Sequence, residues 1–252
     1  MGRRGFILFS MNINPAIFKA YDIRSTVPGE ITQETAYLVG RAYINYLRNN
    51  PALAGPIQIV VSSDARPSSP ELKAELIRGM IEEDADATII DTGLATTPMH
   101  YFAINYLRAD GGVTVTASHN TKEYNGFKLS RRGAATIYQG GGMEEIKNCM
   151  IRGVFETPNR RGKTIQSNIE RDYIEFLLSN IHANEFTKRF KIVFDCGNGM
   201  AGVTELNILK QLDCELIVLY EKPDGTFPNH EADPVKEVNL KALKEKVKKE
   251  SA

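Results

Sequence analysis

Short apolar runs rich in β-branched residues alternate along the chain with stretches in which apolar residues recur at helical spacing. Runs that are apolar on both faces predict buried strands, and the stretches between them predict helices that cover the sheet on both sides. The expected strands are Ile57–Ser62, Ala87–Thr92, Gly112–Thr116, Lys191–Asp195 and Glu215–Leu219. The predicted fold class is therefore α/β with a mostly parallel sheet.

Start signals accompany the expected helices. Ser69-Pro70-Glu71 places an N-cap serine, a proline and an acid before one apolar helical face. Thr97-Pro98 likewise places an N-cap threonine and a proline before another apolar face. A third helix is expected from about Asn168, and a fourth carries Leu240 and Val247 near the C-terminus. These apolar faces are interpreted as core faces of the protein.

The stretch 151–168 is polar, has no clear period, and is typical of a crossing between two domains. We therefore expect a first domain over residues 11–155 and a second over residues 156–252, with an N-terminal extension before Met11. Only two strands are expected after the crossing, and the sequence stops directly after a helix. Because an α/β domain usually continues from such a helix into another strand, the second domain is expected to be incomplete.

The charge balance and the cysteine spacing argue against several classes of protein. The 31 Lys and Arg residues balance 31 Asp and Glu residues, so no overall field attracts nucleic acid or an anionic membrane. No window approaches the roughly 18 consecutive apolar residues of a transmembrane helix. Cys149, Cys196 and Cys214 lack the spacing of a disulfide framework or zinc site, so a reducing cytoplasm is the default location.

The segment Gly111–Asn120 carries the most informative chemistry. A strand runs into a tight polar turn, which places Ser118 at the carboxyl end of a parallel sheet, where α/β proteins bind ligands. A helix cap or Asx turn is the structural alternative. A Ser–His–Asp hydrolase fits poorly, because adjacent residues on a turn do not easily bring His119 Nε2 onto the Ser118 hydroxyl, and the Gly-x-Ser-x-Gly elbow is absent.

Two arginines lie where they could hold a phosphate group. Arg24 is expected in a loop with Tyr21 before the first helix, and Arg66 follows the strand that ends near Ser62. The planar guanidinium suits bidentate contact with phosphate. For Arg66, a salt bridge with Asp64 is the alternative interpretation.

Together these segments resemble the α-D-phosphohexomutases, and among them the bacterial phosphomannomutase/phosphoglucomutase group. The likeness runs from about Phe18 to the C-terminus, and it implies two α/β/α domains with mixed, mostly parallel sheets. The matching motifs, in order, are Tyr21-Asp-Ile-Arg24, Asp64-Ala-Arg66-Pro-Ser-Ser-Pro70, Thr97-Pro98, Thr116-Ala-Ser-His-Asn120, Tyr124-Asn-Gly-Phe-Lys128 and Asp224-Gly-Thr-Phe-Pro-Asn-His230.

The resemblance implies an enzyme that interconverts hexose 6-phosphate and hexose 1-phosphate of mannose or glucose through a hexose 1,6-bisphosphate. Ser118 would carry the phosphoryl group and contact Mg²⁺ through it. Arg24 would steady a phosphate beside Tyr21, and His119 would support the loop. Lys128 would carry a proton or stabilise charge; as a base it needs an ammonium that loses its proton readily, which like charges such as Arg24 would promote.

Supporting roles around the implied site fall to Asp64, Arg66, Asn120 and Asn125. The family's Asp-Gly-Asp-x-Asp-Arg magnesium loop has no counterpart in the sequence and would fall just after Ala252. We therefore expect negligible mutase activity from residues 1–252 alone, and self-association through exposed apolar surface. The alternative functions are a non-catalytic fragment that binds sugar phosphate or a partner chain, and a serine hydrolase.

Overall fold

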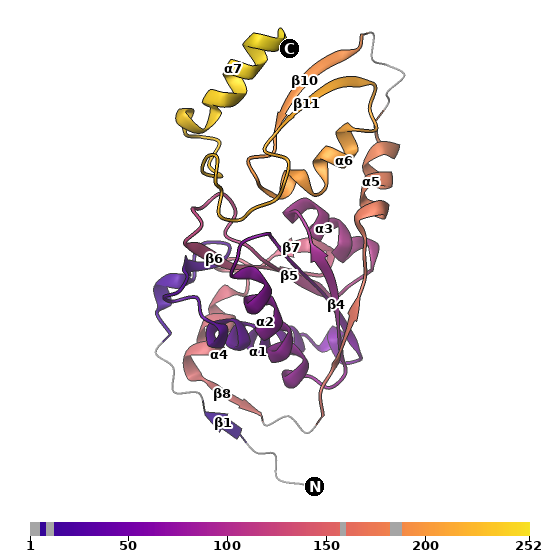
Figure 1. Cartoon of the computed structure of the whole chain (residues 1–252). Helices are drawn as coiled ribbons and strands as arrows, with labels where there is room; N and C mark the ends of the chain where they lie inside the picture. Colours follow the sequence, from indigo (N-terminus) through magenta and orange to yellow (C-terminus); the bar gives the residue numbers. More distant parts are fainter. Residues whose placement is uncertain (1–5, 9–12, 157–159, 182–187) are drawn as a thin grey trace.

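The computed structural model describes residues 6–8, 13–156, 160–181 and 188–252, which form two α/β units stacked end to end (Figure 1). The larger unit is built on one mixed sheet, in which β5, β3, β4 and β9 run parallel and β6 runs antiparallel to both β2 and β5. Its strand order is β2 (Ile23–Thr26), β6 (Tyr124–Arg131), β5 (Gly111–Val115), β3 (Ile57–Ser63), β4 (Ala87–Leu94) and β9 (Lys163–Gln166), with β7 (Ala135–Thr136) paired to β6.

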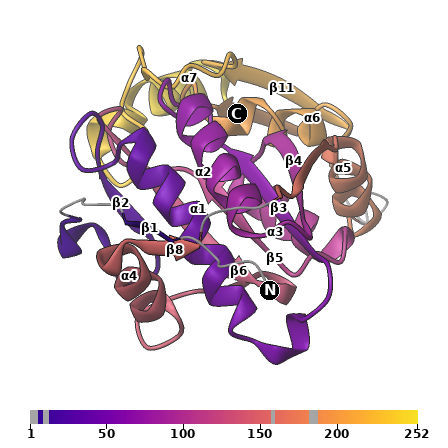
Figure 2. The same ribbon diagram turned by 90° about the horizontal axis from the view of Figure 1, so that it is seen from below.

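Helices cover both faces of this sheet (Figure 2). One face packs against α1 (Gln33–Arg48), α2 (Ser69–Glu83) and α4 (Met143–Arg152), and the other against α3 (Thr97–Tyr106) and α5 (Glu170–Ser179). Strand β3 alternates between them: Ile57, Ile59 and Val61 join the first core and Val60 joins the second. The prediction of an α/β fold with a covered, mostly parallel sheet is confirmed.

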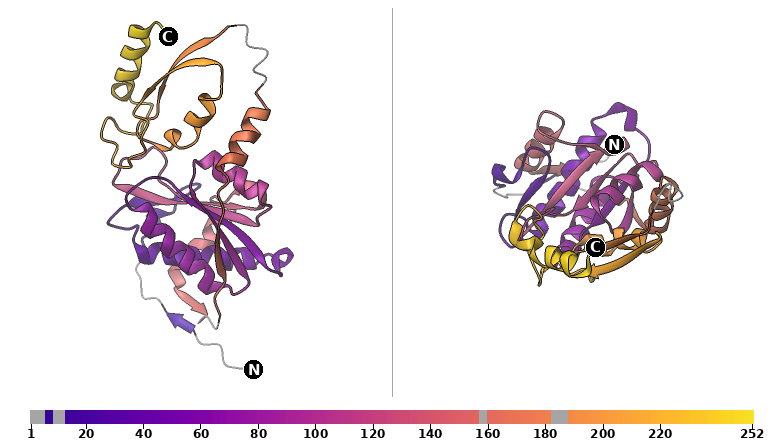
Figure 3. Two further views of the ribbon diagram at one scale, coloured as in Figure 1. Left: turned by 45° about the vertical axis from the view of Figure 1, so that its right-hand side comes forward. Right: turned by 90° about the horizontal axis from the view of Figure 1, so that it is seen from above.

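The smaller unit contains parallel strands β10 (Phe190–Asp195) and β11 (Cys214–Leu219), with α6 (Glu205–Leu209) and α7 (Lys241–Glu250) beside them (Figure 3). All five strands predicted from the apolar runs are therefore present. Far from this unit, β1 (Phe6–Leu8) pairs antiparallel with β8 (Val154–Glu156). Met11, the first residue of the predicted first domain, lies outside the described residues. Short 3₁₀ helices cover Pro15–Ile17, Pro51–Leu53, Arg132–Ala134, Met200–Gly202 and Glu237–Leu240.

Several local predictions need correction. The N-caps lie one residue earlier than expected, at Ser68 and at Thr96, and only Thr96 accepts a cap hydrogen bond, from the Met99 amide. The Ser69 hydroxyl instead donates to Asp64. Arg24 lies in strand β2 rather than in a loop, because Ile23–Thr26 pairs with β6.

The predicted crossing at residues 151–168 is more than a linker. It supplies β8 and also β9, which extends the sheet of the larger unit by pairing with β4. All four residues of β9 are exposed, so no hydrophobic alternation marks this strand in the sequence. The domain boundary at residues 155/156 stays a prediction. None of the helices within the described ranges has the length and apolar character needed to span a bilayer.

Candidate active site

The serine loop, defined as Thr116–Thr121, leaves the carboxyl end of β5 at the top of the sheet. Ser118 has a φ of +57°, a left-handed conformation that is uncommon for residues other than glycine and is found disproportionately at functional sites. Its amide donates to Thr116 Oγ1 at 3.0 Å, and the Asn120 amide donates to the Ala117 carbonyl at 3.1 Å. The loop thereby presents the Ser118 side chain, which is exposed, to solvent.

His119 stands beside the serine but does not form a hydrolase-like pair with it. Its Nδ1 lies 3.4 Å from Ser118 Oγ, at the long limit for a hydrogen bond. The Nε2 geometry of a Ser–His pair is not made, as expected for neighbours on a turn.

Arg66 holds the serine loop from beneath. Its Nε donates to Asp64 Oδ2 at 3.0 Å. Both Nη atoms donate only to main-chain carbonyls, at 2.6–3.1 Å: those of Ser118, Asn120, Thr121 and Tyr124. All five N–H groups of the guanidinium are thus used, so Arg66 does not act as a phosphate clamp; the salt-bridge interpretation is the correct one.

The buried position of Arg66 depends on a polar network behind it. Burial lowers the pKa of Arg66 from its ordinary value, while the neighbouring Asp64 carboxylate opposes that shift. Asp64 also accepts from the Ser69 hydroxyl at 2.6 Å. Asn125, which is fully buried, donates to Ser68 Oγ and Ser69 Oγ at 2.8 and 3.0 Å. Asp64 and Asn125 therefore support the loop through Arg66 and the start of α2.

Arg24 and Lys128 come together on the paired strands β2 and β6, and share one carboxylate. Arg24 Nη1 donates to Asn120 Oδ1 at 2.6 Å, which ties it to the serine loop. Asp22, with a side chain only 4% exposed, lies 3.8 Å from Arg24 Nε and 3.5 Å from Lys128 Nζ. The Lys128 ammonium also lies 5.1 Å from the centre of the Tyr21 ring.

Asp22 is the residue that sequence reasoning missed, although it lies inside the quoted Tyr21–Arg24 motif. Lys128 was expected to face the like charge of Arg24, whereas the described structure puts a carboxylate against both cations. Lys128 therefore has a carboxylate partner as well as a cationic neighbour, and its assignment to proton transfer or charge stabilisation stays a prediction.

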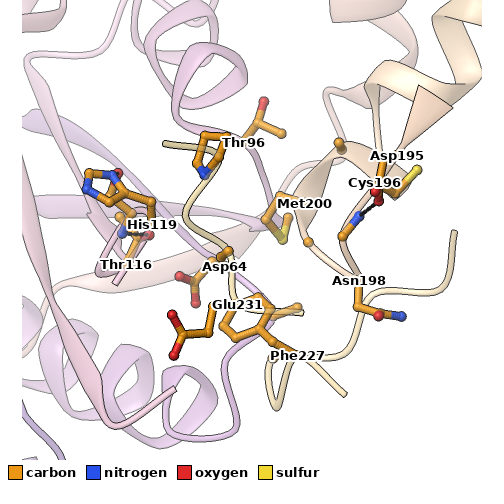
Figure 4. A pocket seen from close by; sticks show the side chains of 18 of the residues that line it. Asp64, Thr96, Thr116, His119, Asp195, Cys196, Asn198, Met200, Phe227 and Glu231 are labelled. Carbon is orange, nitrogen blue, oxygen red and sulfur yellow. Dashed lines mark hydrogen bonds between the residues drawn. The ribbon is translucent and has the colours of Figure 1, made fainter. Parts of the chain in front are cut away.

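A cavity of about 570 Å³ lies between the two units and opens onto the serine loop (Figure 4). Ser118, His119 and Thr96 line it from the larger unit. The smaller unit contributes the Asp195–Asn198 turn after β10 and the segment Gly225–Ala232. Of the predicted site residues, Arg24 and Lys128 are not among the lining residues, and Arg24 reaches the loop through Asn120.

The residues that line this cavity provide only part of a binding site for the expected magnesium ion. Across the described ranges, no three His, Cys, Asp or Glu side chains cluster closely enough to hold a metal ion. Asp195, which lines the cavity from the second unit, instead faces His230, with Oδ2 at 3.2 Å from Nε2. The described residues therefore do not fit a complete Mg²⁺ site, although Ser118 lines the cavity together with the carboxylates of Asp64 and Glu231.

Comparison with known proteins gives a consistent result. Residues 15–156 match the family described as phosphoglucomutase/phosphomannomutase, alpha/beta/alpha domain I, and residues 171–252 match domain II of the same family. The chain is 37% identical over 243 residues to phosphomannomutase/phosphoglucomutase of Pseudomonas aeruginosa, covering 94% of this chain and 48% of that protein.

Two further relatives agree. Phosphomannomutase of Salmonella typhimurium is 39% identical over 225 residues, which cover 86% of this chain and 47% of that protein. A crystal structure of a phosphoglucomutase/phosphomannomutase family protein from Burkholderia thailandensis superposes with a TM-score of 0.82 at 36% identity, over 93% of this chain and 50% of that one. The chain thus spans about half the length of the curated relatives it matches.

Proposed function

This chain belongs to the phosphoglucomutase/phosphomannomutase family, and from that premise we propose that its Ser118 carries the phosphoryl group in the interconversion of hexose 6-phosphate and hexose 1-phosphate. One observation above all supports the proposal. The backbone of Ser118 is held in a left-handed conformation after the carboxyl end of β5, and its exposed side chain lines the cavity between the units. A carrier must be accessible and fixed, because phosphoryl transfer depends on positioning and electrostatics.

The enzyme carries a phosphoryl group on Ser118 both before and after each reaction cycle. In the first half, the P–Oγ bond of phosphorylated Ser118 breaks while a hexose hydroxyl oxygen forms the new P–O bond. The hydroxyl proton ends on Ser118 Oγ, which yields the 1,6-bisphosphate and a free serine hydroxyl. In the second half, Ser118 Oγ attacks the other phosphorus, and its proton ends on the leaving sugar oxygen. Arg24, held against the serine loop through Asn120, would supply positive charge near the transferred group, and Lys128, which shares the Asp22 carboxylate with Arg24, would add to it.

When bound, a magnesium ion would offset the negative charge of the phosphoserine. Because the described residues contribute no cluster of carboxylates, we assign no step to it. For the same reason we expect residues 1–252 alone to show negligible turnover of hexose phosphates in a coupled assay. Turnover at the rate of an ordinary enzyme would contradict this part of the proposal.

Transfer of label to the serine tests the central claim. The chain is incubated with glucose or mannose 1,6-bisphosphate carrying ³²P, and the phosphorylated residue is located by mass spectrometry. One stoichiometric transfer needs no repeated turnover, so after long incubation we expect label on Ser118, none in Ser118→Ala, and unchanged label in Ser179→Ala, which removes an exposed hydroxyl from α5. Label on another residue would remove Ser118 from its role. Reaction of Ser118 with an organophosphonate probe in place of bisphosphate would favour the hydrolase.

A further inference from the structure

The second unit contains a turn, Asp224–Phe227, that takes no part in the proposed reaction. The Asp224 carboxylate accepts from the Thr226 amide at 2.9 Å and from the Thr226 hydroxyl at 2.7 Å. The Phe227 amide donates to the Asp224 carbonyl at 2.9 Å, and Phe227 has a φ of +51°. The Asp224 amide donates to the Asn198 carbonyl at 2.7 Å, which anchors the turn to the segment that follows β10.

This turn docks directly onto the backbone that carries Arg66. Gly225 is buried, and a Cβ atom at this position would lie 2.4 Å from the Ala65 carbonyl oxygen and 2.4 Å from Arg66 Cα. Only glycine permits an approach this close, because such distances do not occur for real Cβ atoms. The Phe227 ring lies beside the guanidinium, with its centre 5.3 Å from Arg66 Cζ, within the range of a cation–π contact.

Arg66 is therefore touched by two structures at once. On one side, Gly225 and Phe227 of the second unit pack against it. On the other side, its guanidinium donates to four main-chain carbonyls of the serine loop and the residues after it. We propose that Gly225 and Phe227 are positioning residues that hold Ser118 in place through Arg66. The order of the serine loop then depends on the docking of the second unit onto the first.

The physical basis is exclusion of water from the guanidinium. Arg66 is only 2% exposed, and part of that cover comes from the second unit. If the turn withdraws, water competes for the N–H groups that now bind the Ser118 and Asn120 carbonyls. The inference rests on the proposed carrier role of Ser118 for its catalytic meaning, but the mechanical coupling does not depend on that role.

Amide hydrogen exchange measured by mass spectrometry tests the coupling without any phosphoryl chemistry. The variants are Phe227→Leu, which removes the aromatic face, Phe227→Tyr, which keeps it, and Gly225→Ala, which forces the turn away from Arg66. Phe176→Leu on α5 and Gly55→Ala are the matched controls, since Phe176 is 52% exposed and a Cβ on Gly55 meets nothing within 4 Å.

We expect the peptide over residues 116–124 to exchange about tenfold faster in Phe227→Leu and Gly225→Ala, with Phe227→Tyr and both controls close to wild type. The peptide over β3 should exchange at the wild-type rate in every variant, which separates loop release from general loss of stability. Unchanged exchange of residues 116–124 in Phe227→Leu would overturn the proposal, even if Gly225→Ala fails to fold.

Labelling with the bisphosphate then separates this inference from the proposed function. Faster exchange of the loop together with slower labelling of Ser118 supports both. Faster exchange with no label on Ser118 in any variant supports the coupling and removes the carrier role. Normal labelling and normal exchange in Phe227→Leu leaves the carrier role intact and removes the coupling.

Discussion

The guanidinium of Arg66 donates to the main-chain carbonyl of Ser118 at 3.0 Å, so a buried arginine contacts the backbone of the serine rather than its hydroxyl. The contact fixes the position of Ser118 and leaves its Oγ free. A single buried side chain therefore determines where the backbone of the serine lies.

Replacement of Arg66 by lysine should be costly despite the retained charge. Lysine has three donors on one atom and cannot satisfy the fork of acceptors that Arg66 serves, so buried carbonyls lose their partners. We expect Arg66→Lys to lower the free energy of unfolding by about 3 kcal/mol in urea titrations. Arg171→Lys, at an exposed pair with Glu175, should stay within about 0.5 kcal/mol of wild type. Equal effects at the two sites would contradict the role given to Arg66.

The sequence contains clear signals for the buried strands and for the serine loop, but not for what holds that loop. Runs such as Ile57–Ser62 are apolar on both faces, and the structure confirms them as strands. The partners of Arg66 are mostly main-chain carbonyls, which every residue possesses, so no side-chain pattern reveals them. Asp64 alone was visible as a partner, because a carboxylate two residues away is a recognisable pair.

Antiparallel pairing was the other feature that the sequence concealed. Strand β2 has only four residues, and one of them, Arg24, is charged, so neither apolar run nor alternation marks it. Its pairing with β6 brings Asp22 between Arg24 and Lys128. That contact joins residues more than a hundred positions apart in the chain and could not be inferred from local spacing. The shared carboxylate therefore emerged only from the structure.

The Asp22–Lys128 ion pair should show measurable energetic coupling. Their side chains are 4% and 15% exposed. Asp22→Asn leaves the Lys128 charge without this carboxylate, and Lys128→Met leaves Asp22 with Arg24 alone. In a double-mutant cycle of Asp22→Asn and Lys128→Met, we expect the two losses of stability to be non-additive by about 1 kcal/mol. The exposed pair Lys210–Glu221 serves as the control cycle and should couple by less than about 0.5 kcal/mol. Additive losses at Asp22 and Lys128 would show that the contact contributes nothing specific.

Acid should destabilise the protein through His100. Burial lowers the pKa of His100 to about 3, and its Nδ1 lies 2.9 Å from Ser62 Oγ. A histidine in the unfolded chain titrates near 6.5, so below about pH 6.5 the unfolded state takes up a proton that the folded state does not. This contribution is therefore complete above that pH, and stability falls by about 1.4 kcal/mol per pH unit as the pH drops toward 3.

Substitution of the histidine isolates its contribution. His100→Asn keeps a polar atom near the Nδ1 position and cannot titrate, so its unfolding free energy should depend less steeply on pH between 6 and 5. An identical slope in wild type and His100→Asn would show that the buried imidazole is not the group responsible.

Helices α1 and α2 should tolerate no methyl group where they cross. A Cβ atom on Gly79 would lie 2.1 Å from the Tyr37 carbonyl oxygen, and one on Gly40 would lie 2.2 Å from the Leu76 carbonyl oxygen. Helix propensity alone favours alanine over glycine by about 1 kcal/mol, but the backbone atoms in the way belong to the facing helix and cannot rotate aside. We therefore expect Gly79→Ala to destabilise the chain by about 1–3 kcal/mol in chemical denaturation, whereas Gly55→Ala should change stability by less than about 0.5 kcal/mol. A more stable Gly79→Ala protein would mean that propensity outweighs the crossing, and that the two helices can separate without loss to the core that supports β3 and the serine loop.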